Sequence, residues 1–239
     1  MQAPPQDPPQ DPPPTLAALA AFDGSLSQRV YQTLRQSILS LGYRPGQMIR
    51  KGEICAALGV SRSPVGEAMA RLATEGLVDV VPQAGSFVAR VSMAEIREGA
   101  FLREALELAA VEQVATTLTP AQLAELTAIL QQQADLTRAG DAEGFYAADG
   151  ALHEAIMAMT GHRRLAAMTR TAWVHVDRAR RLILPRPGRI AETLGEHQAI
   201  VAALAAHDPQ TARAATRAHL RQLLTQLEPL AEQRPELFT

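Results

Sequence analysis

Three histidines and one aspartate in the C-terminal part of the chain have types and spacings that suit a metal ion. Asp149 and His153 stand four residues apart in DGALH, so a helix would present both side chains on one face. His197 lies in GEHQAI and His219 in TRAHL, each within a further stretch of helical pattern. Two ligands from one helix and one from each of two others form a metal site in a helical bundle. The alternative is that each histidine is an ordinary surface or core residue.

Three imidazoles and one carboxylate favour a transition metal. They suit zinc, nickel, iron or manganese much better than calcium or magnesium. We therefore predict a divalent transition metal as the cofactor, with zinc first and nickel, manganese or iron as alternatives. The same set of side chains can activate a water molecule, so a metal-dependent hydrolase is a second hypothesis. A metal that only stabilises the fold is a third.

Helices would have to position all four residues. After Ser92 the strand signals end, and helical pattern continues in six blocks. Glycines and prolines such as Gly140, Gly161 and Pro209 fall where one block ends or the next begins. Short connections between successive helices predict an antiparallel bundle. The predicted helices span residues 93–117, 120–139, 141–160, 162–184, 187–206 and 208–228.

The segment before these blocks combines three predicted helices with a β-hairpin. Apolar residues recur at helical spacing in the first helix, and Gly59 makes a tight turn between the second and the third, which Ser61 or Ser63 would cap. The predicted helices span 27–41, 52–58 and 61–75, and the extended segments 47–49, 77–81 and 86–91. This order predicts a winged helix-turn-helix, in which one helix enters the major groove of DNA.

The composition describes a folded, mainly α chain with a short unfolded arm. Hydrophobic residues make up 47% of the chain, charged residues 20% and aromatic residues only 4%. Residues 1–14 are rich in Pro, Gln and Asp and lack apolar periodicity, so they should be disordered. We expect a disordered arm over 1–20, an N-terminal winged helix-turn-helix over 21–91 and a C-terminal all-α antiparallel helical bundle over 92–239.

Positive charge is concentrated in the winged-helix segment. Residues 27–91 hold eight basic and four acidic side chains, whereas the whole chain has a net charge of −2. A local excess of positive charge suits the DNA backbone. No apolar run approaches the roughly 20 residues of a membrane-spanning helix, and the N-terminus lacks the pattern of a secretory signal. The single cysteine, Cys55, fits a reducing compartment, so we predict a cytoplasmic protein with no membrane partner.

The N-terminal segment resembles the winged-helix domain of the GntR family of bacterial repressors. SLGYRPGQMI (40–49), GVSRSPVGEAMARLATEGLV (59–78) and PQAGSFV (82–88) carry the resemblance in order. It implies that Arg62 reaches a guanine edge or a nearby phosphate, because an arginine fork matches the two acceptors of guanine. The other implied DNA contacts are to the backbone or, at the wing tip, to the minor groove: Arg35, Arg50, Lys51, Arg71, Gln83 and Gly85. The alternative is that the basic side chains form a solvated helix face.

One residue of the expected recognition helix departs from the family pattern. Gly66 stands where the family usually has arginine, giving PVGEAM in place of a PVREAL-like run. Glycine should cost about 1 kcal/mol of helix stability relative to alanine. It also removes a base contact worth about 1–3 kcal/mol. The operator sequence therefore cannot be copied from relatives.

The C-terminal segment resembles the ligand-binding domain of the FadR subfamily, called FCD. The resemblance is carried by FLREALELAA (101–110), FYAADGALHEAIMAMTGH (145–162), EHQAIVAAL (196–204) and DPQTARAATRAHL (208–220). It implies that Asp149, His153, His197 and His219 are the metal ligands, because all four match positions that hold the ion in metal-binding members. The fatty-acyl-sensing member lacks this set, which argues against an acyl-CoA ligand. His207 is expected to be a helix-end residue.

Arg103 matches an arginine that faces the ligand pocket in relatives. Near a metal with open coordination positions, its guanidinium would bind a carboxylate through two hydrogen bonds. This implies a small organic acid as the effector, such as a hydroxy acid, a sugar acid or a dicarboxylate. The alternative is a structural salt bridge to Glu107, four residues further on. Other candidates for the same cavity are Arg178, Arg181 and Trp173, with the helix surface as the alternative for both arginines.

These features predict a metabolite-responsive transcriptional regulator and not an enzyme. A homodimer, which the resemblance implies, would present two winged helices to a palindromic double-stranded DNA operator. The effector would shift the population between DNA-competent and incompetent arrangements, with repression as the expected action. The hydrolase hypothesis has only Glu154 and Glu196 as extra bases beside the quartet, and it leaves the winged helix unexplained. A purely structural metal is the alternative to a sensing role.

Overall fold

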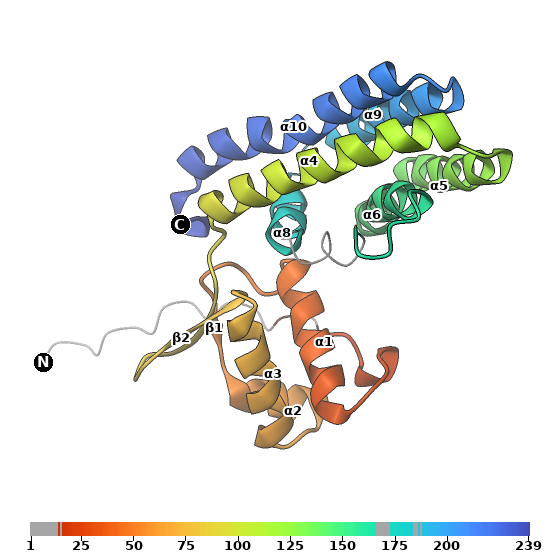
Figure 1. Ribbon diagram of the computed structural model, residues 1–239. Helices are drawn as coiled ribbons and strands as arrows, with labels where there is room; N and C mark the ends of the chain where they lie inside the picture. The colour runs from red at the N-terminus through yellow and green to blue at the C-terminus, as the bar shows by residue number, and fades with distance from the viewer. Residues whose placement is uncertain (1–13, 15, 166–172, 184–185, 187) are drawn as a thin grey trace, which may run out of the picture. The chain divides into compact units, whose positions relative to one another are not determined.

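Two compact units divide the chain, and they separate between Arg90 and Val91. The computed structural model describes residues 14, 16–165, 173–183, 186 and 188–239, and the statements below refer to these residues. The first unit combines helices with a small sheet, and the second consists mainly of long helices (Figure 1). The predicted fold class, a winged helix-turn-helix followed by an all-α domain, is confirmed.

The first helix of the N-terminal unit is α1 (Leu26–Leu39). Ser25 begins it, because its side chain accepts a hydrogen bond from the backbone N–H of Gln28 at 3.3 Å. The apolar positions that predicted this helix are fully buried: Val30, Leu34 and Ile38. One turn of 3-10 helix, Leu19–Ala21, precedes it and begins inside the stretch that we expected to be disordered up to residue 20.

The helix-turn-helix consists of α2 (Lys51–Leu58) and α3 (Arg62–Thr74). The turn between them needs a left-handed residue, and Gly59 supplies it with φ 64°. Ser61 occupies the N-cap of α3, but its side chain makes no capping hydrogen bond. Arg62 is therefore the first residue of the helix that we predicted to read DNA.

The wing is an antiparallel hairpin of β2 (Val78–Val81) and β3 (Gly85–Val88), and β1 (Met48–Ile49) pairs with the other edge of β3. The second hairpin strand was expected to reach Val91 but ends at Val88. Val91 pairs instead with the C-terminal segment: its N–H donates to Leu237 O at 2.9 Å, and Thr239 N–H donates back to Val91 O at 3.1 Å.

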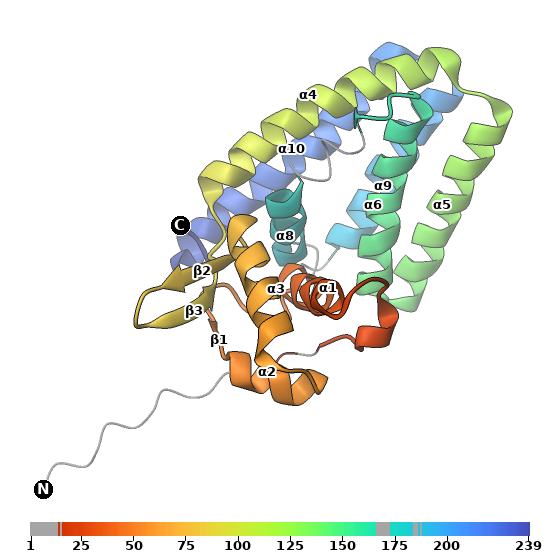
Figure 2. The ribbon, with the colours of Figure 1, turned by 60° about the horizontal axis from the view of Figure 1, so that its bottom comes forward.

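Six α-helices of the second unit lie in the described residues. They are α4 (Met93–Thr117), α5 (Pro120–Ala139), α6 (Ala142–Met159), α8 (Val174–Ile183), α9 (Arg189–Ala205) and α10 (Pro209–Gln233). The long helices α4 and α10 run side by side in both ribbon views, and α5 lies beside α6 (Figures 1 and 2). None of the helices in the described part of the chain is both long and apolar enough to cross a membrane.

Side chains from these helices form two apolar clusters. The larger joins α4, α6, α9 and α10 through fully buried residues such as Ala115, Leu152 and Leu204. The smaller packs α8 against α10 and the C-terminus, around Val176 and Leu227. Between these clusters the same helices carry buried charged and polar side chains, which form the site described below.

Two helix boundaries differ from those predicted by more than two residues. The last helix was expected to stop at residue 228, before Pro229, but α10 continues to Gln233. Leu230 and Ala231 pack against the smaller cluster, so apolar burial offsets the hydrogen bond that proline cannot donate. The helix predicted over 162–184 is α8 from Val174, preceded by non-helical residues 162–164, and residues 166–172 of that prediction lie outside the described residues.

Candidate metal centre and DNA-contacting surface

The three predicted histidine ligands converge in the core of the second unit. His153 on α6, His197 on α9 and His219 on α10 each offer a ring nitrogen, and these three atoms all lie within 4.8 Å of one another. All three side chains are buried. The Nε2 atoms of His153 and His219 face each other at 3.2 Å. Helices far apart in the sequence thus bring together the histidines that the spacing singled out.

Each imidazole is held from behind through its Nδ1 atom. His153 Nδ1 lies 2.7 Å from Glu107 Oε2, and His219 Nδ1 lies 2.7 Å from Glu196 Oε2. His197 Nδ1 lies 2.9 Å from Oε1 of the fully buried Gln133. Carboxylate and amide oxygens only accept hydrogen bonds, so each ring donates from Nδ1 and leaves a lone pair on Nε2. This arrangement orients histidines for a metal ion.

The three nitrogen donors suit a transition metal in their spacing and orientation. Two Nε2 lone pairs that face each other repel unless a cation or proton lies between them. Nitrogens bound to one zinc at tetrahedral angles would be about 3.3 Å apart, close to the 3.2 Å between His153 and His219. The Nε2 of His197 is buried and has no hydrogen-bond partner among the described residues. The site therefore has the three nitrogen donors and the orientation that such an ion needs.

Asp149, the fourth predicted ligand, lies at the edge of the group. Its side chain is fully buried, and its Oδ1 is 3.6 Å from His197 Nε2. Its other oxygen forms an ion pair with Arg180 of α8. Asp149 thus adjoins the histidines but is also engaged by an arginine, a partner that the sequence analysis missed.

Burial and nearby charges keep two of the histidines in the neutral form that a metal ion requires. Burial holds the pKa of His197 and of His219 well below the usual range, and the nearby guanidinium groups of Arg103 and Arg180 lower both further. These two imidazoles are therefore neutral at pH 7. Burial alone would raise the pKa of Glu107, but Arg103 and His153 outweigh it and hold that pKa below its usual range. The carboxylate behind His153 is thus charged.

A small cavity of about 30 Å³ adjoins the histidines, which is room for a water molecule or two. Three arginines from three helices line it, Arg103, Arg180 and Arg189, together with Asp149 and His219. All three guanidinium groups are almost entirely buried. Arginines at such a site provide donors for carboxylate or other oxyanion groups.

Both alternatives for Arg103 have support in the structure. Its Nε donates to Glu107 Oε1 at 2.5 Å, so the salt bridge is present. Its Nη2 is buried and has no hydrogen-bond partner among the described residues, and Arg103 also lines the cavity. The guanidinium lies 5.0 Å above the ring of the buried Trp173, which fixes its position. One arginine thus pairs with the carboxylate behind His153 and has a second, buried N–H group without a partner among the described residues.

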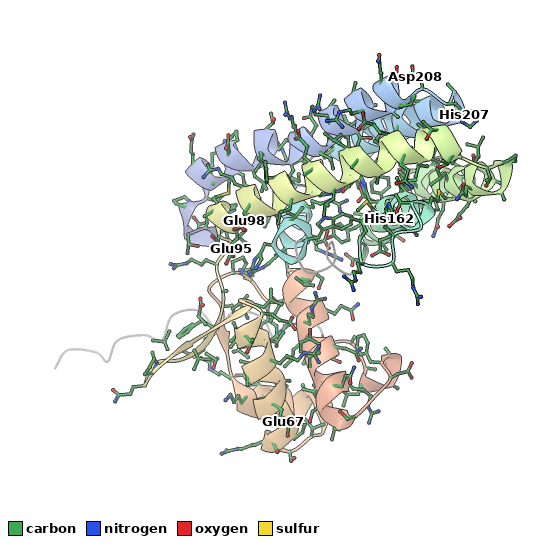
Figure 3. The ribbon with its side chains drawn as sticks, viewed as in Figure 1. Glu67, Glu95, Glu98, His162, His207 and Asp208 are labelled. Atoms are coloured by element: carbon green, nitrogen blue, oxygen red, sulfur yellow. The ribbon has the colours of Figure 1, made fainter. Side chains whose placement is uncertain are left out.

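Other candidates take different places. Arg178 is 1% exposed, so the helix-surface alternative for it is wrong, whereas Arg181 pairs with Glu143 at 2.5 Å near the surface. Neither lines the small cavity. His207 was expected to be a helix-end residue, and it directly follows the C-cap residue of α9, with its Nδ1 2.8 Å from Ala115 O. It lies away from His162 (Figure 3). Gln133, Arg180 and Arg189 carried no recognisable motif, and only their place on inward helix faces could have suggested them.

The bases of the hydrolase hypothesis do not face the histidines as free groups. Glu196 binds His219 Nδ1 and receives two hydrogen bonds from Arg189, each 2.8 Å long. Glu154 is exposed on α6. A general base must reach a water at the metal from its own unengaged oxygen. The arrangement instead uses Glu196 to orient a histidine.

The predicted DNA-contacting residues divide into free and engaged side chains. Arg62, Lys51, Gln83 and Gly85 are exposed. Gln83 has φ 61° and Gly85 φ 130°, so the wing tip is a tight turn. The remaining three arginines are near acidic groups: Arg50 pairs with Glu53 at 3.4 Å, while Arg35 and Arg71 both pair with Glu75 at 3.4 Å.

Glu75 organises one end of α3 against α1. Tyr31 donates a hydrogen bond to its Oε1 at 2.6 Å, and the Arg71 guanidinium lies 3.8 Å above the Tyr31 ring. These contacts give Arg35 and Arg71 a role in packing two helices together. Arg62 lies at the N-terminal end of α3. The N-terminal residues of a recognition helix are those that contact base edges.

Replacing Gly66 with arginine should strengthen or redirect DNA binding. A Cβ at Gly66 would meet nothing within 4 Å, so there is open space where the new side chain would begin. It would add a base contact worth about 1–3 kcal/mol and gain about 1 kcal/mol of helix stability. A DNA-binding titration against promoter fragments measures both affinity and site preference. Unchanged values for both would contradict the prediction.

A winged helix joined to an all-helical domain with a buried polar pocket defines a class of transcriptional regulator. Residues 26–88 match the family described as bacterial regulatory proteins, gntR family, and residues 98–222 match the FCD domain. A transcriptional regulator of Streptomyces ambofaciens is 38% identical over 223 residues, which cover 92% of this chain and 93% of that protein. The chain therefore belongs to the GntR family of transcriptional regulators and carries an FCD domain.

Two further comparisons agree with this assignment. The transcriptional repressor RspR of Escherichia coli K12 is 27% identical over 214 residues, covering 90% of this chain and 94% of RspR. The solved structure of E. coli McbR has a TM-score of 0.72 and 26% identity, and the match covers 87% of this chain and 99% of McbR. Both extend across the DNA-binding and FCD domains.

Proposed function

We propose that this protein is a metabolite-responsive repressor whose FCD domain binds a small carboxylate ligand beside a transition metal. One observation carries the proposal: three buried histidines each bring a ring nitrogen within 4.8 Å of the other two, next to a cavity lined by arginines. The ion would be held by His153, His197 and His219, with Asp149 adjoining, and it would supply open coordination positions for an acid. Zinc suits the nitrogen donors best, with nickel, manganese and iron as alternatives.

The chain's own residues would bind and orient the ligand. Arg103 offers its Nη2, and Arg180 and Arg189 add positive charge around the same cavity. A hydroxy acid, a sugar acid or a dicarboxylate would meet these donors with its carboxylate groups. The cavity is small, so an acid larger than a few atoms requires neighbouring side chains to move.

The DNA-binding unit would act as one half of a dimer. Two copies related by a twofold axis would place two α3 helices on a palindromic operator, in the cytoplasm. Arg62 would contact a base, and the backbone or the minor groove would be contacted by the wing tip and by four basic residues, Arg35, Arg50, Lys51 and Arg71. Ligand binding in the FCD domain would change the population of the DNA-competent arrangement.

The proposal is tested by DNA binding with and without candidate acids. A gel-shift titration of the zinc-loaded protein against the promoter region next to its own gene should show a specific complex. One of a panel of hydroxy acids, sugar acids and dicarboxylates should change the apparent affinity by about 5–150-fold. Absence of a specific complex under every condition would disprove the DNA-binding part. A complex that responds to no acid, in a protein stabilised by metal, would favour a purely structural ion.

A further inference from the structure

Every arginine of the small cavity is paired with a carboxylate that belongs to the metal centre. Arg103 donates to Glu107 at 2.5 Å, and Glu107 holds His153 Nδ1 with its other oxygen. Arg189 binds Glu196 through two hydrogen bonds of 2.8 Å, and one oxygen of Glu196 also holds His219 Nδ1. Two of the arginines that line the cavity are thus connected to two histidines by continuous chains of hydrogen bonds.

The third pair touches the centre more directly. Arg180 forms an ion pair with Asp149, whose second oxygen lies 3.6 Å from His197 Nε2. The side chains of the three arginines are only 5%, 9% and 7% exposed for Arg103, Arg180 and Arg189, respectively. Water screens charges poorly at such depth, so each guanidinium acts strongly on its carboxylate and on a nearby cation.

We propose that Arg103, Arg180 and Arg189 lower the affinity of the site for the metal until an anion in the cavity neutralises their charges. This inference rests on the proposed metal site. Each arginine draws a carboxylate's charge away from the imidazole that it supports, or away from the ion itself. Each also places a positive charge near the ion. An anion that binds the guanidinium groups removes both effects, so metal and anion bind cooperatively, each raising the affinity for the other.

The geometry leaves a place for such an anion to act. Arg103 Nη2 is buried and has no hydrogen-bond partner among the described residues, although the Nε of the same guanidinium is bound to Glu107. A carboxylate that binds Nη2 therefore joins the chain Arg103–Glu107–His153 without breaking it. The metal and the effector would thus be sensed together, and neither would bind at full affinity alone.

The test measures zinc affinity alone, by competition with a chromophoric chelator, in the full-length protein without added acids. Replacing an arginine by glutamine removes the positive charge of the guanidinium. The substitution therefore imitates an anion that neutralises this charge by binding to it. Arg189→Gln should tighten zinc binding about tenfold, the lower end of the range for groups that support metal ligands. Arg221→Gln is the matched control, because Arg221 also binds a glutamate, Glu104, through two hydrogen bonds of 2.9 Å but is exposed and lies outside the small cavity. It should leave zinc affinity unchanged.

A double-mutant cycle separates this effect from loss of packing. Glu196→Gln removes the charge that supports His219 and should weaken zinc binding about tenfold. If Arg189 acts through Glu196, adding Arg189→Gln to the Glu196→Gln protein should give much less than its tenfold gain. Circular dichroism and thermal unfolding without zinc check that each variant is folded. Arg103→Gln, in the separate chain through Glu107, replaces Arg189→Gln if that variant does not fold.

Each outcome decides a different question. Zinc affinity within twofold of the wild type in folded Arg189→Gln and Arg103→Gln proteins, or weaker than the wild type in both, would overturn the proposed opposition. Equal tightening in the Arg221→Gln control would show a general charge effect and would also overturn it. A folded wild-type protein that binds no transition metal would instead disprove the metal site itself.

Discussion

Replacing His197 with alanine is expected to abolish the stabilisation of the protein by zinc. A ligand present at about 1,000 times its dissociation constant stabilises the folded state by about 4 kcal/mol. For a unit of this size, 4 kcal/mol corresponds to a rise in Tm of roughly 10 °C. His197 is fully buried and offers an Nε2 with no hydrogen-bond partner among the described residues, so its loss removes one of three converging donors. Thermal unfolding of the variant with and without zinc should give the same Tm.

The comparison within each variant is essential, because His197→Ala also perturbs the metal-free protein. The substitution leaves Oε1 of the buried Gln133 without its partner, which costs about 1–3 kcal/mol. His162→Ala is the matched control: it removes an exposed histidine whose Nε2 lies 3.2 Å from Gln113 Oε1. That variant should keep the full zinc-induced rise. A rise that persists in His197→Ala would refute the assignment of this histidine as a ligand.

Replacing Arg62 with alanine is expected to have the largest effect on operator binding. Arg62 is exposed at the first residue of α3 and pairs with no acidic group among the described ion pairs, so its guanidinium is available to a base edge. A bidentate contact to guanine is worth about 1–3 kcal/mol of discrimination. In a dimer on two half-sites the substitution removes two such contacts, one from each protomer. The loss of both corresponds to a fall in operator affinity of at least about 30-fold. Fluorescence anisotropy at fixed salt, with operator and scrambled DNA, measures the effect.

Arg71→Ala distinguishes base reading from general charge. Arg71 is engaged by Glu75 and Tyr31, and a phosphate contact from it carries no sequence information. Its loss should weaken binding to operator and scrambled DNA about equally and should reduce the salt dependence. Arg62→Ala should instead weaken operator binding more than scrambled binding. Full preference for the operator in the Arg62→Ala protein would show that another residue reads the base.

Local sequence pattern predicted the secondary structure well where one physical cause dominates. The apolar period of α1, the glycine between α2 and α3 and the capped starts of α5 and α10 each reflect an interaction within a few residues. The boundaries that differed depend on distant partners. β3 ends early because Val91 pairs with the C-terminus, and α10 passes Pro229 because Leu230 packs on the smaller cluster.

The candidate site shows the same division. The types and spacing of His153, His197 and His219 already indicated a metal centre, because few residue types bind transition metals. His153 follows Asp149 by one helical turn, and all three histidines lie in stretches that resemble the FCD domain. The sequence did not indicate which side chains form hydrogen bonds with the imidazole rings. Gln133 and His197 are 64 residues apart, and Glu107 and His153 are 46 apart.

The sequence by itself thus determined the family, the two kinds of domain and the three histidines at the centre of the site. Only the tertiary structure showed that Asp149 forms an ion pair with Arg180 beside His197. It also showed that Arg103 and Arg189 are connected to histidines through the carboxylates of glutamates. The physical reason is that arginines and glutamates are common on helices, so their types alone indicate no role. Burial around one small cavity, where each charge needs a partner, decides which of these side chains pair with one another.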